Sequence, residues 1–458
     1  MTMTRTGRWA VFVLAAAIGG CARNTRVPQP SITRELAVAT FDTAWVRIDR
    51  TFYDTVFLST RWKTLRDSLR PVAGNARTNT ELRNVLQTLI SSVGVSHFGL
   101  IPSEASPAVS DVPATPNAAT AERGTIGVSL RLAGDELVLW RVDSLGPAWR
   151  AGLRPGMPVT AIDRTPIQEE ISQLGRIRDA EVRRQARLTA VMRANALLGG
   201  NRGDSVSLVV TQKGKSGAMT MVRGPMRGQM LRFGNLPPIN GSVEVAERAV
   251  NGRRIGVLMF SVWLPQLTTQ IDRAFDRMRG LDAIVIDLRG NPGGLAAMVS
   301  GVAGHVLDSS FAIGTLRQRT QTITLSANPR RVSSDSPPIP VRPYSGPVAI
   351  IMDQLSGSTS EFFAAGLQGL GRAHIIGETS AGRALPALMD RLPNDDVLMH
   401  VVADLTDSRG RRVEGVGVIP DELVPLKAAS LAAEKDDALD AALRWAASQR
   451  RLVKGDQR

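Results

Sequence analysis

The sequence contains a single cysteine, Cys21, among 458 residues. One thiol cannot form an internal disulfide, so a disulfide-stabilised fold is excluded. Aromatic residues make up only 4% of the chain, and the formal charge of +14 is carried by scattered arginines with no accompanying aromatic–basic module. We therefore expect no nucleic-acid partner. No His, Cys, Asp or Glu cluster has the spacing of metal ligands, which predicts neither a metal nor a cofactor.

Long apolar runs are also missing. After residue 20, no segment reaches the ~18 uninterrupted apolar residues of a membrane-spanning helix. Near the N-terminus, Arg5 and Arg8 precede a short apolar stretch that ends in Ile18-Gly19-Gly20-Cys21. This pattern is typical of an export signal, and its end resembles a bacterial lipobox. A plain signal peptide with an incidental cysteine is the alternative.

The lipobox interpretation predicts cleavage after residue 20 and attachment of a lipid to the sulfur of Cys21. The mature protein would then be exported and anchored by lipid to the cell envelope, on the periplasmic side. Ala22-Arg23 follows the cysteine and lacks the acidic residue usually associated with inner-membrane retention, which favours the outer membrane.

Composition and periodicity divide the chain into several regions. Apolar residues such as Trp45, Ile48 and Phe52 recur at helical spacing near the start of the mature chain. A later stretch rich in Ser, Pro and Ala indicates a linker. The expected regions are a signal peptide (1–20), a tether (21–33), an N-terminal helical region (34–101), a linker (102–122), a β domain (123–225), an α/β domain (250–427), and a C-terminal helix with its tail (428–458).

The β region resembles a PDZ domain. Gly146–Gly156 matches the signature S-PA-xx-AGL-xx-GD, with Met157 in place of its usual Asp. The resemblance implies that Thr125, Ile126, Gly127 and Val128 form the loop whose amides receive a peptide C-terminus. Gln168–Leu198 is a long additional helical stretch, which either covers the peptide groove or presents its arginines to solvent. A spacer that binds no peptide is the alternative.

The α/β region alternates apolar strands with helices, which predicts a parallel-rich sheet. Almost wholly apolar strands indicate burial on both faces. The expected strands are Ile255–Phe260, Ala283–Leu288, Val348–Met352, His374–Ile376 and Val397–Leu405. The expected helices are Leu267–Met278, Leu295–Leu307, Ser360–Gly369 and Ala428–Ser448.

Three motifs in this region resemble those of the tail-specific, or carboxyl-terminal processing, serine protease superfamily. They are Asp287–Gly294 (DLRGNPGG), Ser356–Glu361 (SGSTSE) and Ser408–Asp421 (SRGRRVEGVGVIPD). The resemblance implies an α/β fold with a mixed catalytic sheet and flanking helices, similar to ClpP and crotonase. A PDZ-like β domain and an N-terminal helical region complete that architecture.

By this resemblance Ser358 is the nucleophile. It lies at a strand-to-helix turn, where the amides of Thr359 and Gly293 can stabilise a tetrahedral oxyanion. Ser360 is expected to cap the following helix, with Glu361 in its first turn.

One position departs from the Ser–Lys dyad of the family. The dyad lysine stands 25 residues after the nucleophile, and here that position is Arg383 (383 − 358 = 25). Arginine keeps its proton at any working pH and cannot act as a general base. Another residue must therefore deprotonate Ser358, or the protein is inactive.

Histidine is scarce, and one of the four residues stands in a suggestive context. Ser96-His97 resembles a step in the tricorn-like branch of the superfamily, which uses a Ser–His–Ser–Glu tetrad. The resemblance implies His97 as general base, Ser96 as its orienting neighbour and Glu414 as the fourth member. We expect the other three histidines to be structural: His305, His374 and His400.

The sequence thus predicts a serine endopeptidase that acts on envelope or periplasmic polypeptides, without a cofactor. The alternative is a catalytically inactive lipoprotein whose PDZ-like domain still recruits polypeptide tails.

Overall fold

A computed structural model describes residues 31–105, 122–212, 214–234 and 238–449. The proposed signal peptide, Cys21, most of the tether and most of the linker lie outside these residues. Within them, no helix combines the length and apolarity needed to cross a membrane.

The N-terminal region is helical, as predicted, and packs on the later part of the chain. Thr33 caps its first helix by accepting a hydrogen bond from the N–H of Leu36. Its apolar core also contains Leu398 and Val401, so the helices share a core with a distant strand. The elements are α1 (Arg34–Thr51), α2 (Thr55–Phe57), a π-helical turn (Leu58–Trp62), α3 (Lys63–Gly74), α4 (Asn79–Ser91), β1 (Gly99–Ile101) and a 3-10 turn (Ser103–Ala105).

A small β domain follows, with three short sheets around an apolar core that includes Ile126, Leu130 and Val191. Its elements are β2 (Arg123–Thr125), β3 (Val128–Ala133), β4 (Glu136–Val142), α5 (Pro147–Arg150), β5 (Val159–Ile162), α6 (Ile167–Leu174), α7 (Ala180–Leu198), β6 (Gly200–Asn201), β7 (Ser205–Gln212), β8 (Lys215–Val222) and β9 (Gly224–Pro225).

The largest body is built on a six-stranded sheet in the order β12-β13-β14-β17-β18-β22. β12 and β13 are antiparallel, and the remaining neighbours are parallel, which gives the predicted mixed sheet. The strands are β12 (Val243–Val250), β13 (Arg253–Phe260), β14 (Ala283–Asp287), β17 (Val348–Met352), β18 (His374–Gly377) and β22 (Glu422–Leu423).

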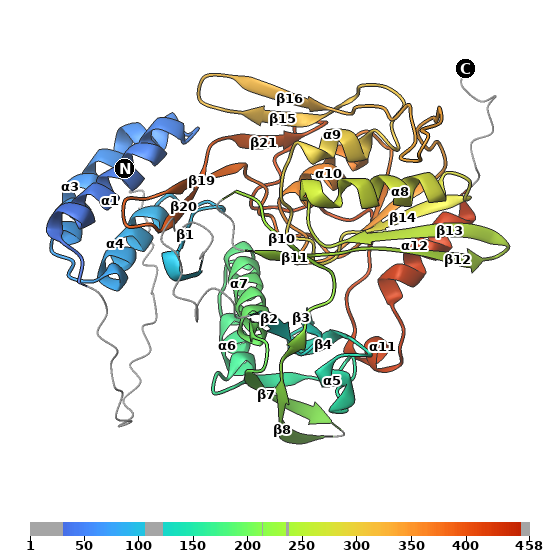
Figure 1. Cartoon of the computed structure of the whole chain (residues 1–458), viewed down its shortest axis with the longest axis horizontal. Helices are drawn as coiled ribbons and strands as arrows, with labels where there is room; N and C mark the ends of the chain where they lie inside the picture. The colour runs from blue at the N-terminus through green and yellow to red at the C-terminus, as the bar shows by residue number, and fades with distance from the viewer. Residues whose placement is uncertain (1–30, 106–121, 213, 235–237, 450–458) are drawn as a thin grey trace, which may run out of the picture.

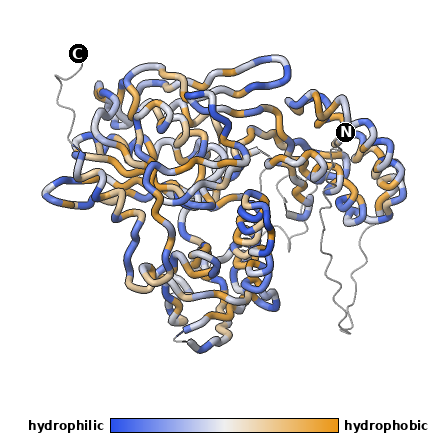
Figure 2. Tube along the Cα trace, turned by 180° about the vertical axis from the view of Figure 1, so that it is seen from behind, coloured by the Kyte–Doolittle hydropathy of each residue, from blue (hydrophilic) through white to orange (hydrophobic). Residues whose placement is uncertain are grey.

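Helices cover both faces of this sheet, so its central strands are buried throughout. Ile284 and Ile286 of β14 face a core with α8, α9 and α10, whereas Val285 faces a core with α12. Figure 1 shows the first three helices on one side of the sheet and α12 on the other, and Figure 2 shows apolar colours along the central strands. These helices are α8 (Thr268–Met278), α9 (Met298–Ala303), α10 (Thr359–Gly369) and α12 (Asp437–Ser448).

Smaller elements frame the sheet. β1 pairs with β20, which pairs with β19, and a separate sheet has the order β16-β15-β21. The remaining elements are β10 (Gln229–Leu231), β11 (Ile239–Gly241), a 3-10 turn (Pro265–Leu267), β15 (Ala312–Arg317), β16 (Thr322–Ser326), β19 (Ala387–Arg391), β20 (Val397–Val401), β21 (Asp404–Asp407) and α11 (Ala428–Ala432).

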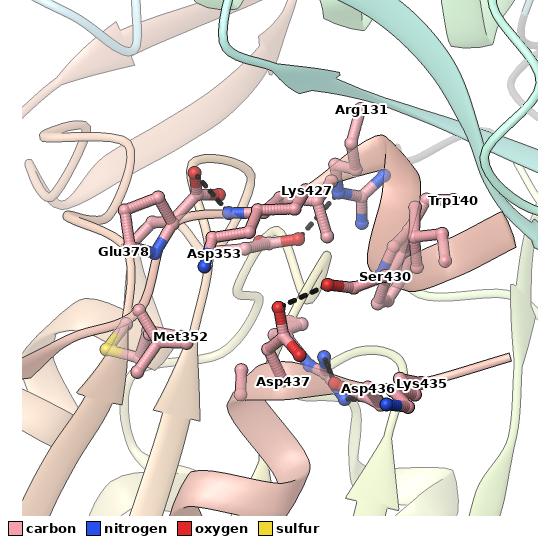
Figure 3. A pocket seen from close by; sticks show the side chains of 17 residues that line it. Arg131, Trp140, Met352, Asp353, Glu378, Lys427, Ser430, Lys435, Asp436 and Asp437 are labelled. Carbon is pink, nitrogen blue, oxygen red and sulfur yellow. Dashed lines mark hydrogen bonds and ion pairs between the residues drawn. The ribbon is translucent and has the colours of Figure 1, made fainter. Parts of the chain in front are cut away.

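A cationic cluster around Trp140 joins the β domain to the large body. The guanidinium carbons of Arg131, Arg141 and Arg289 lie 4.3, 4.2 and 5.3 Å from its ring centroid. Arg131 also pairs with Asp353 at 2.6 Å, and both line the small pocket of Figure 3. Cation–π contacts and a buried ion pair thus fix the β domain against the end of the central sheet.

Four predicted elements were wrong in their extent. The helix predicted at Leu295–Leu307 is shorter, since α9 spans only Met298–Ala303. Val397–Leu405 is two strands in different sheets, because the chain leaves β20 and joins β15 as β21. Ala428–Ser448 is two helices separated by residues 433–436, where Asp436 caps α12. Gln168–Leu198 is also two helices, since Asp179 caps a new helix after residues 175–178.

Candidate active site

Ser358 lies where β17 gives way to α10, in a backbone conformation that non-glycine residues seldom adopt. Its φ is +52° and its ψ is −117°. The N–H of Ser358 is held by the carbonyl of Arg383 at 2.8 Å and by Oε2 of Glu361 at 3.0 Å. Strain of this kind persists only where neighbouring contacts fix the residue, and it is common at functional sites.

Glu361 is fully buried behind this turn. Its carboxylate accepts hydrogen bonds from the hydroxyl of Ser380 and from the N–H groups of Gly382, Arg383 and Ser358. Burial raises its pKa to about 7, although the four hydrogen bonds favour the ionised form. The side chain therefore links the nucleophile turn to residues 380–383. Sequence reasoning placed Glu361 in the first helical turn and missed this role.

Ser96, His97 and Glu414 form a hydrogen-bonded chain. The hydroxyl of Ser96 lies 2.7 Å from Nδ1 of His97 and donates to Oε2 of Glu414 at 2.9 Å. Glu414 also accepts from the N–H groups of Ser96 and Ala384, both at 2.9 Å. Since the single hydroxyl proton of Ser96 goes to Glu414, Ser96 must accept a proton from Nδ1 of His97. This tautomer leaves the lone pair on Nε2, as a general base requires.

Residues 382–384 connect the two groups. Gly382 and Arg383 donate to Glu361 behind Ser358, whereas Ala384 donates to Glu414 beside His97. In the described ranges, no hydrogen bond joins the imidazole of His97 to the hydroxyl of Ser358. Catalytic hydrogen bonds are often long without substrate and shorten when it binds.

The surroundings of His97 favour its neutral form. Burial, and then the charge of Arg383, lower the pKa of His97 to about 4. An imidazole with this pKa is unprotonated across neutral and mildly acidic pH. The backbone φ of His97 is +60°, so this residue is also strained.

Gly293 lies against the nucleophile turn. A Cβ at this position would lie 2.5 Å from Cβ of Ser358 and 2.8 Å from N of Thr359. Thr359 is the first residue of α10, so its N–H has no acceptor within the helix. The N–H of Gly293 is donated to Oδ1 of Asn291 at 3.0 Å. The structure thus brings both predicted oxyanion residues to Ser358, with one of the two amides already bonded.

Ser360 does not cap α10, contrary to the sequence-based expectation. Its buried hydroxyl accepts from Nε1 of Trp263 at 2.9 Å and donates to the carbonyl of Asn291 at 3.1 Å. The helix begins one residue earlier, so the N-cap position belongs to Ser358. Ser360 instead fastens the helix to the Asn291 loop.

The side chain of Arg383 points away from Ser358 toward α7 of the β domain. It contacts Thr189, Gln185 and Met192. On the same helix, Arg184 donates to the carbonyls of Ser380 and Gly415. Arg184 is therefore not on a solvated face. The helix α7 lies directly against the loops that carry the candidate site.

The other histidines have structural partners. His305 is stacked on Phe275, with centroids 4.4 Å apart, and bonds to Asp272. His400 is fully buried and bonds to Thr51 and Asp390. His374 is stacked on Trp445, with centroids 4.7 Å apart. In the part of the chain that is described, no group of three or more His, Cys, Asp or Glu could hold a metal ion.

Part of the proposed peptide-binding loop is occupied by internal contacts. The N–H of Gly127 is donated to the hydroxyl of Thr125 at 2.9 Å, and Ile126 is fully buried. Val128 begins β3, opposite Val142.

The edge of β3 is occupied as well. Both the N–H and the carbonyl of Leu130 bond to the side-chain amide of Asn195 on α7, at 2.9 and 3.0 Å. The helix therefore covers part of the edge along which a peptide strand would add.

Comparison with known proteins places this geometry in a family. Residues 254–424 match the model of peptidase family S41, and residues 39–91 match the tricorn protease C1 domain. The chain carries a peptidase family S41 domain. It is thus a serine-type peptidase by family, and the predicted relationship to the tail-specific proteases, including their tricorn-like branch, is confirmed.

Relatives and solved structures agree with this assignment. A carboxyl-terminal-processing protease of Synechocystis sp. is 22% identical over 391 residues, covering 83% of this chain and 79% of the relative. A protein of the same name from Picosynechococcus sp. is 27% identical over 177 residues, covering 38% of this chain and 40% of the relative.

The photosystem II D1 C-terminal processing protease shares the fold, with a TM-score of 0.57 at 17% identity, covering 90% of this chain and 98% of the other. Mature CPAF gives the same TM-score at 12% identity, covering 90% and 96% of the two chains.

Proposed function

We propose that this S41 chain is a carboxyl-terminal processing endopeptidase that uses Ser358 as nucleophile and His97 as general base. The carrying observation is the hydrogen-bonded chain from His97 through Ser96 to Glu414, which presents Nε2 as the free basic nitrogen. Arg383 stands where the dyad lysine of the family would be and cannot serve as base.

In the proposed mechanism, Nε2 of His97 takes the hydroxyl proton of Ser358 as Oγ attacks the carbonyl carbon of the scissile bond. The N–H of Thr359 stabilises the resulting oxyanion. The N–H of Gly293 adds a second hydrogen bond to the oxyanion after it releases Oδ1 of Asn291. His97 then gives its proton to the leaving amine, and the same imidazole activates the water that hydrolyses the acyl-enzyme.

The substrates we propose are envelope or periplasmic polypeptides, and the protein is anchored there through a lipid on Cys21. Support comes from the short apolar N-terminal segment before the lone cysteine and from the polypeptide-processing names of the relatives. The β domain is proposed to be PDZ-like. Thr125 to Val128 would receive the C-terminus of a peptide after α7 moves away from the edge of β3.

The test combines a serine-reactive phosphonate probe with peptide hydrolysis. The probe should label Ser358 in the wild type and should not label Ser358→Ala. His97→Ala and Ser358→Ala should each lower kcat/KM by several orders of magnitude, and the double variant should be little worse than either, since the two residues act as a unit.

The rival function is an inactive binding lipoprotein, favoured by Arg383 at the position of the catalytic lysine. That reading requires a wild type that is neither labelled nor active on any peptide. Full hydrolysis by His97→Ala would contradict the proposed base instead.

A further inference from the structure

Arg383 stands at the edge of the proposed catalytic centre with its backbone fixed to it. Its carbonyl accepts from the N–H of Ser358 at 2.8 Å, and its own N–H donates to Glu361 at 3.0 Å. Its charge is close enough to His97 to lower the pKa of the imidazole. Because the backbone of Arg383 holds the Ser358 turn while its side chain points toward α7, a group bound by this guanidinium lies at the edge of the catalytic centre, on the side of α7.

The contacts of the guanidinium are all with neutral side chains. Nη2 donates to the hydroxyl of Thr189 at 2.8 Å, while Nε lies 3.4 Å from Oε1 of Gln185 and Nη1 lies 3.4 Å from Sδ of Met192. The contact with Gln185 is long, since strong N–H···O bonds are ~2.9 Å, and the thioether sulfur of Met192 is a weak acceptor. In the described ranges, no salt bridge within 4.0 Å includes Arg383.

Other interior arginines are satisfied in a different way. Arg289 forms ion pairs with Asp287 and Asp436 at 2.6 and 2.7 Å. Arg223 instead donates to several backbone carbonyls, including those of Leu198 and Ser205 at 2.9 Å each. Both residues serve as internal clamps. No carboxylate or backbone carbonyl accepts a hydrogen bond from the guanidinium of Arg383 in the described residues. Its N–H groups can therefore still donate to a stronger acceptor.

The helix α7 holds this guanidinium at the site. Gln185 donates its amide Nε2 to the carbonyl of Ala381 at 2.9 Å, which turns its Oε1 toward Arg383. Arg184, one residue earlier, is fixed to the carbonyls of Ser380 and Gly415. The surface of α7 is thus fastened to the catalytic loops, and the cation is oriented before any ligand arrives.

We propose that Arg383 is a specificity residue that binds a carboxylate of the substrate beside the scissile bond, with Thr189 and Gln185 orienting it. A planar guanidinium binds a carboxylate through two parallel hydrogen bonds. We place this carboxylate within a few residues of the cleaved bond, since the carbonyl of Arg383 bonds to the N–H of Ser358 at 2.8 Å and an extended peptide advances only ~3.3 Å per residue. The carboxylate comes either from an Asp or Glu side chain or from the C-terminus of the polypeptide. The inference rests on the proposed function, because it places the carboxylate relative to a bond cleaved by Ser358.

The experiment compares peptides that differ only in charge. A cleaved, uncharged, C-terminally amidated peptide is the reference. One series places a single Glu or its Gln twin at each of three positions on either side of the bond, and another restores the free C-terminus at stepped distances from it. We expect the wild type to prefer one charged peptide over its neutral twin by at least ~10-fold in kcat/KM, mainly through KM.

The variants Arg383→Gln, Arg383→Lys and Arg193→Gln decide the assignment. Arg383→Gln should bring the ratio of kcat/KM for the charged peptide to that for its neutral twin close to one. Arg383→Lys should give an intermediate ratio, because lysine keeps the charge but lacks the two parallel N–H donors of the guanidinium. Arg193→Gln removes an arginine on α7 that pairs with Glu170 at 2.8 Å, and it should leave the ratio unchanged. Using the ratio cancels any effect of Arg383 on the chemical step.

The same peptides are also titrated into the Ser358→Ala variant, with and without Arg383→Gln. This measures affinity even if no peptide is cleaved, so it separates failure of the proposed function from failure of the carboxylate site. Circular dichroism checks that each variant is folded. A charged-to-neutral ratio that is the same in wild type and Arg383→Gln, in both cleavage and binding, would overturn the proposal.

Discussion

Ser96 donates its hydroxyl proton to Oε2 of Glu414 at 2.9 Å. The contact of the same hydroxyl with Nδ1 of His97, at 2.7 Å, must then use a proton from the imidazole. Two residues that are 318 positions apart thereby fix the tautomer of a third. In the proposed tetrad, Glu414 orients Ser96, and Ser96 in turn orients His97.

The first prediction concerns this chain. Ser96→Ala removes the acceptor of the Nδ1 proton, so the imidazole is no longer held in the basic tautomer. We expect kcat/KM to fall by roughly 10- to 1,000-fold, which is less than after loss of His97 itself. Ser91→Ala, at the exposed end of α4, is the matched control and should retain full activity. Wild-type kinetics in Ser96→Ala would show that Ser96 does not position the base.

The pH dependence of the enzyme follows from the pKa of His97, which burial and Arg383 lower to about 4. Because a base is active when deprotonated, kcat/KM should rise with pH through about 4 and then stay level, instead of rising near the ordinary ~6.5 of histidine. Arg383→Gln removes the smaller of the two causes, so it should move this limb upward without reaching 6.5. A limb at 6.5 in the wild type would contradict a His97 that is partly desolvated and flanked by a cation.

Gly293 supplies a third prediction. In Gly293→Ala the new methyl group would lie 2.5 Å from Cβ of Ser358, and the backbone φ of +99° disfavours any side chain. We expect labelling of Ser358 by the phosphonate probe to fall by at least ~100-fold, in line with the loss of an oxyanion donor. Gly301→Ala, which has open space around its Cβ, should be labelled normally. Equal labelling of both variants would separate Gly293 from the site.

Peptide binding by the β domain gives a fourth prediction. Asn195 occupies both backbone groups of Leu130 on the edge of β3. Asn195→Ala should free this edge, so a peptide with a free apolar C-terminus should bind the Ser358→Ala, Asn195→Ala double variant several-fold more tightly than Ser358→Ala alone. The amidated twin of the peptide should gain less. Identical affinities for the two peptides in both variants would leave the domain as a spacer.

Lipid anchoring is tested by Cys21→Ser. The replacement removes the only thiol, so the protein should move from the membrane fraction to a soluble exported form or remain unprocessed. Fractionation of cells followed by detection of the intact chain measures this. An unchanged membrane fraction would refute the lipobox.

Much of the site could be predicted from local sequence. Ser358 and Gly293 each stand in a short motif, and a motif that bridges a buried strand and a helix needs only neighbouring residues to define its geometry. The strand Val348–Met352 was predicted with its correct ends because its apolar run is bounded on both sides by residues that end strands. The absence of a usable lysine at position 383 is likewise a property of the sequence alone.

The tertiary structure decided what depends on distant parts of the chain. Periodicity showed Val397–Leu405 as one alternating strand, but its two halves pair with different strands, and the partner of a strand is not encoded in its own period. The depressed pKa of His97 arises from burial among segments far apart in sequence and from the charge of Arg383. The direction of the Arg383 side chain, toward α7 and away from Ser358, required the β domain to be docked on the catalytic loops. Local sequence thus indicated which residues are candidates for the chemistry, whereas long-range packing determined the protonation and orientation of these residues and the contacts of Arg383 beside them.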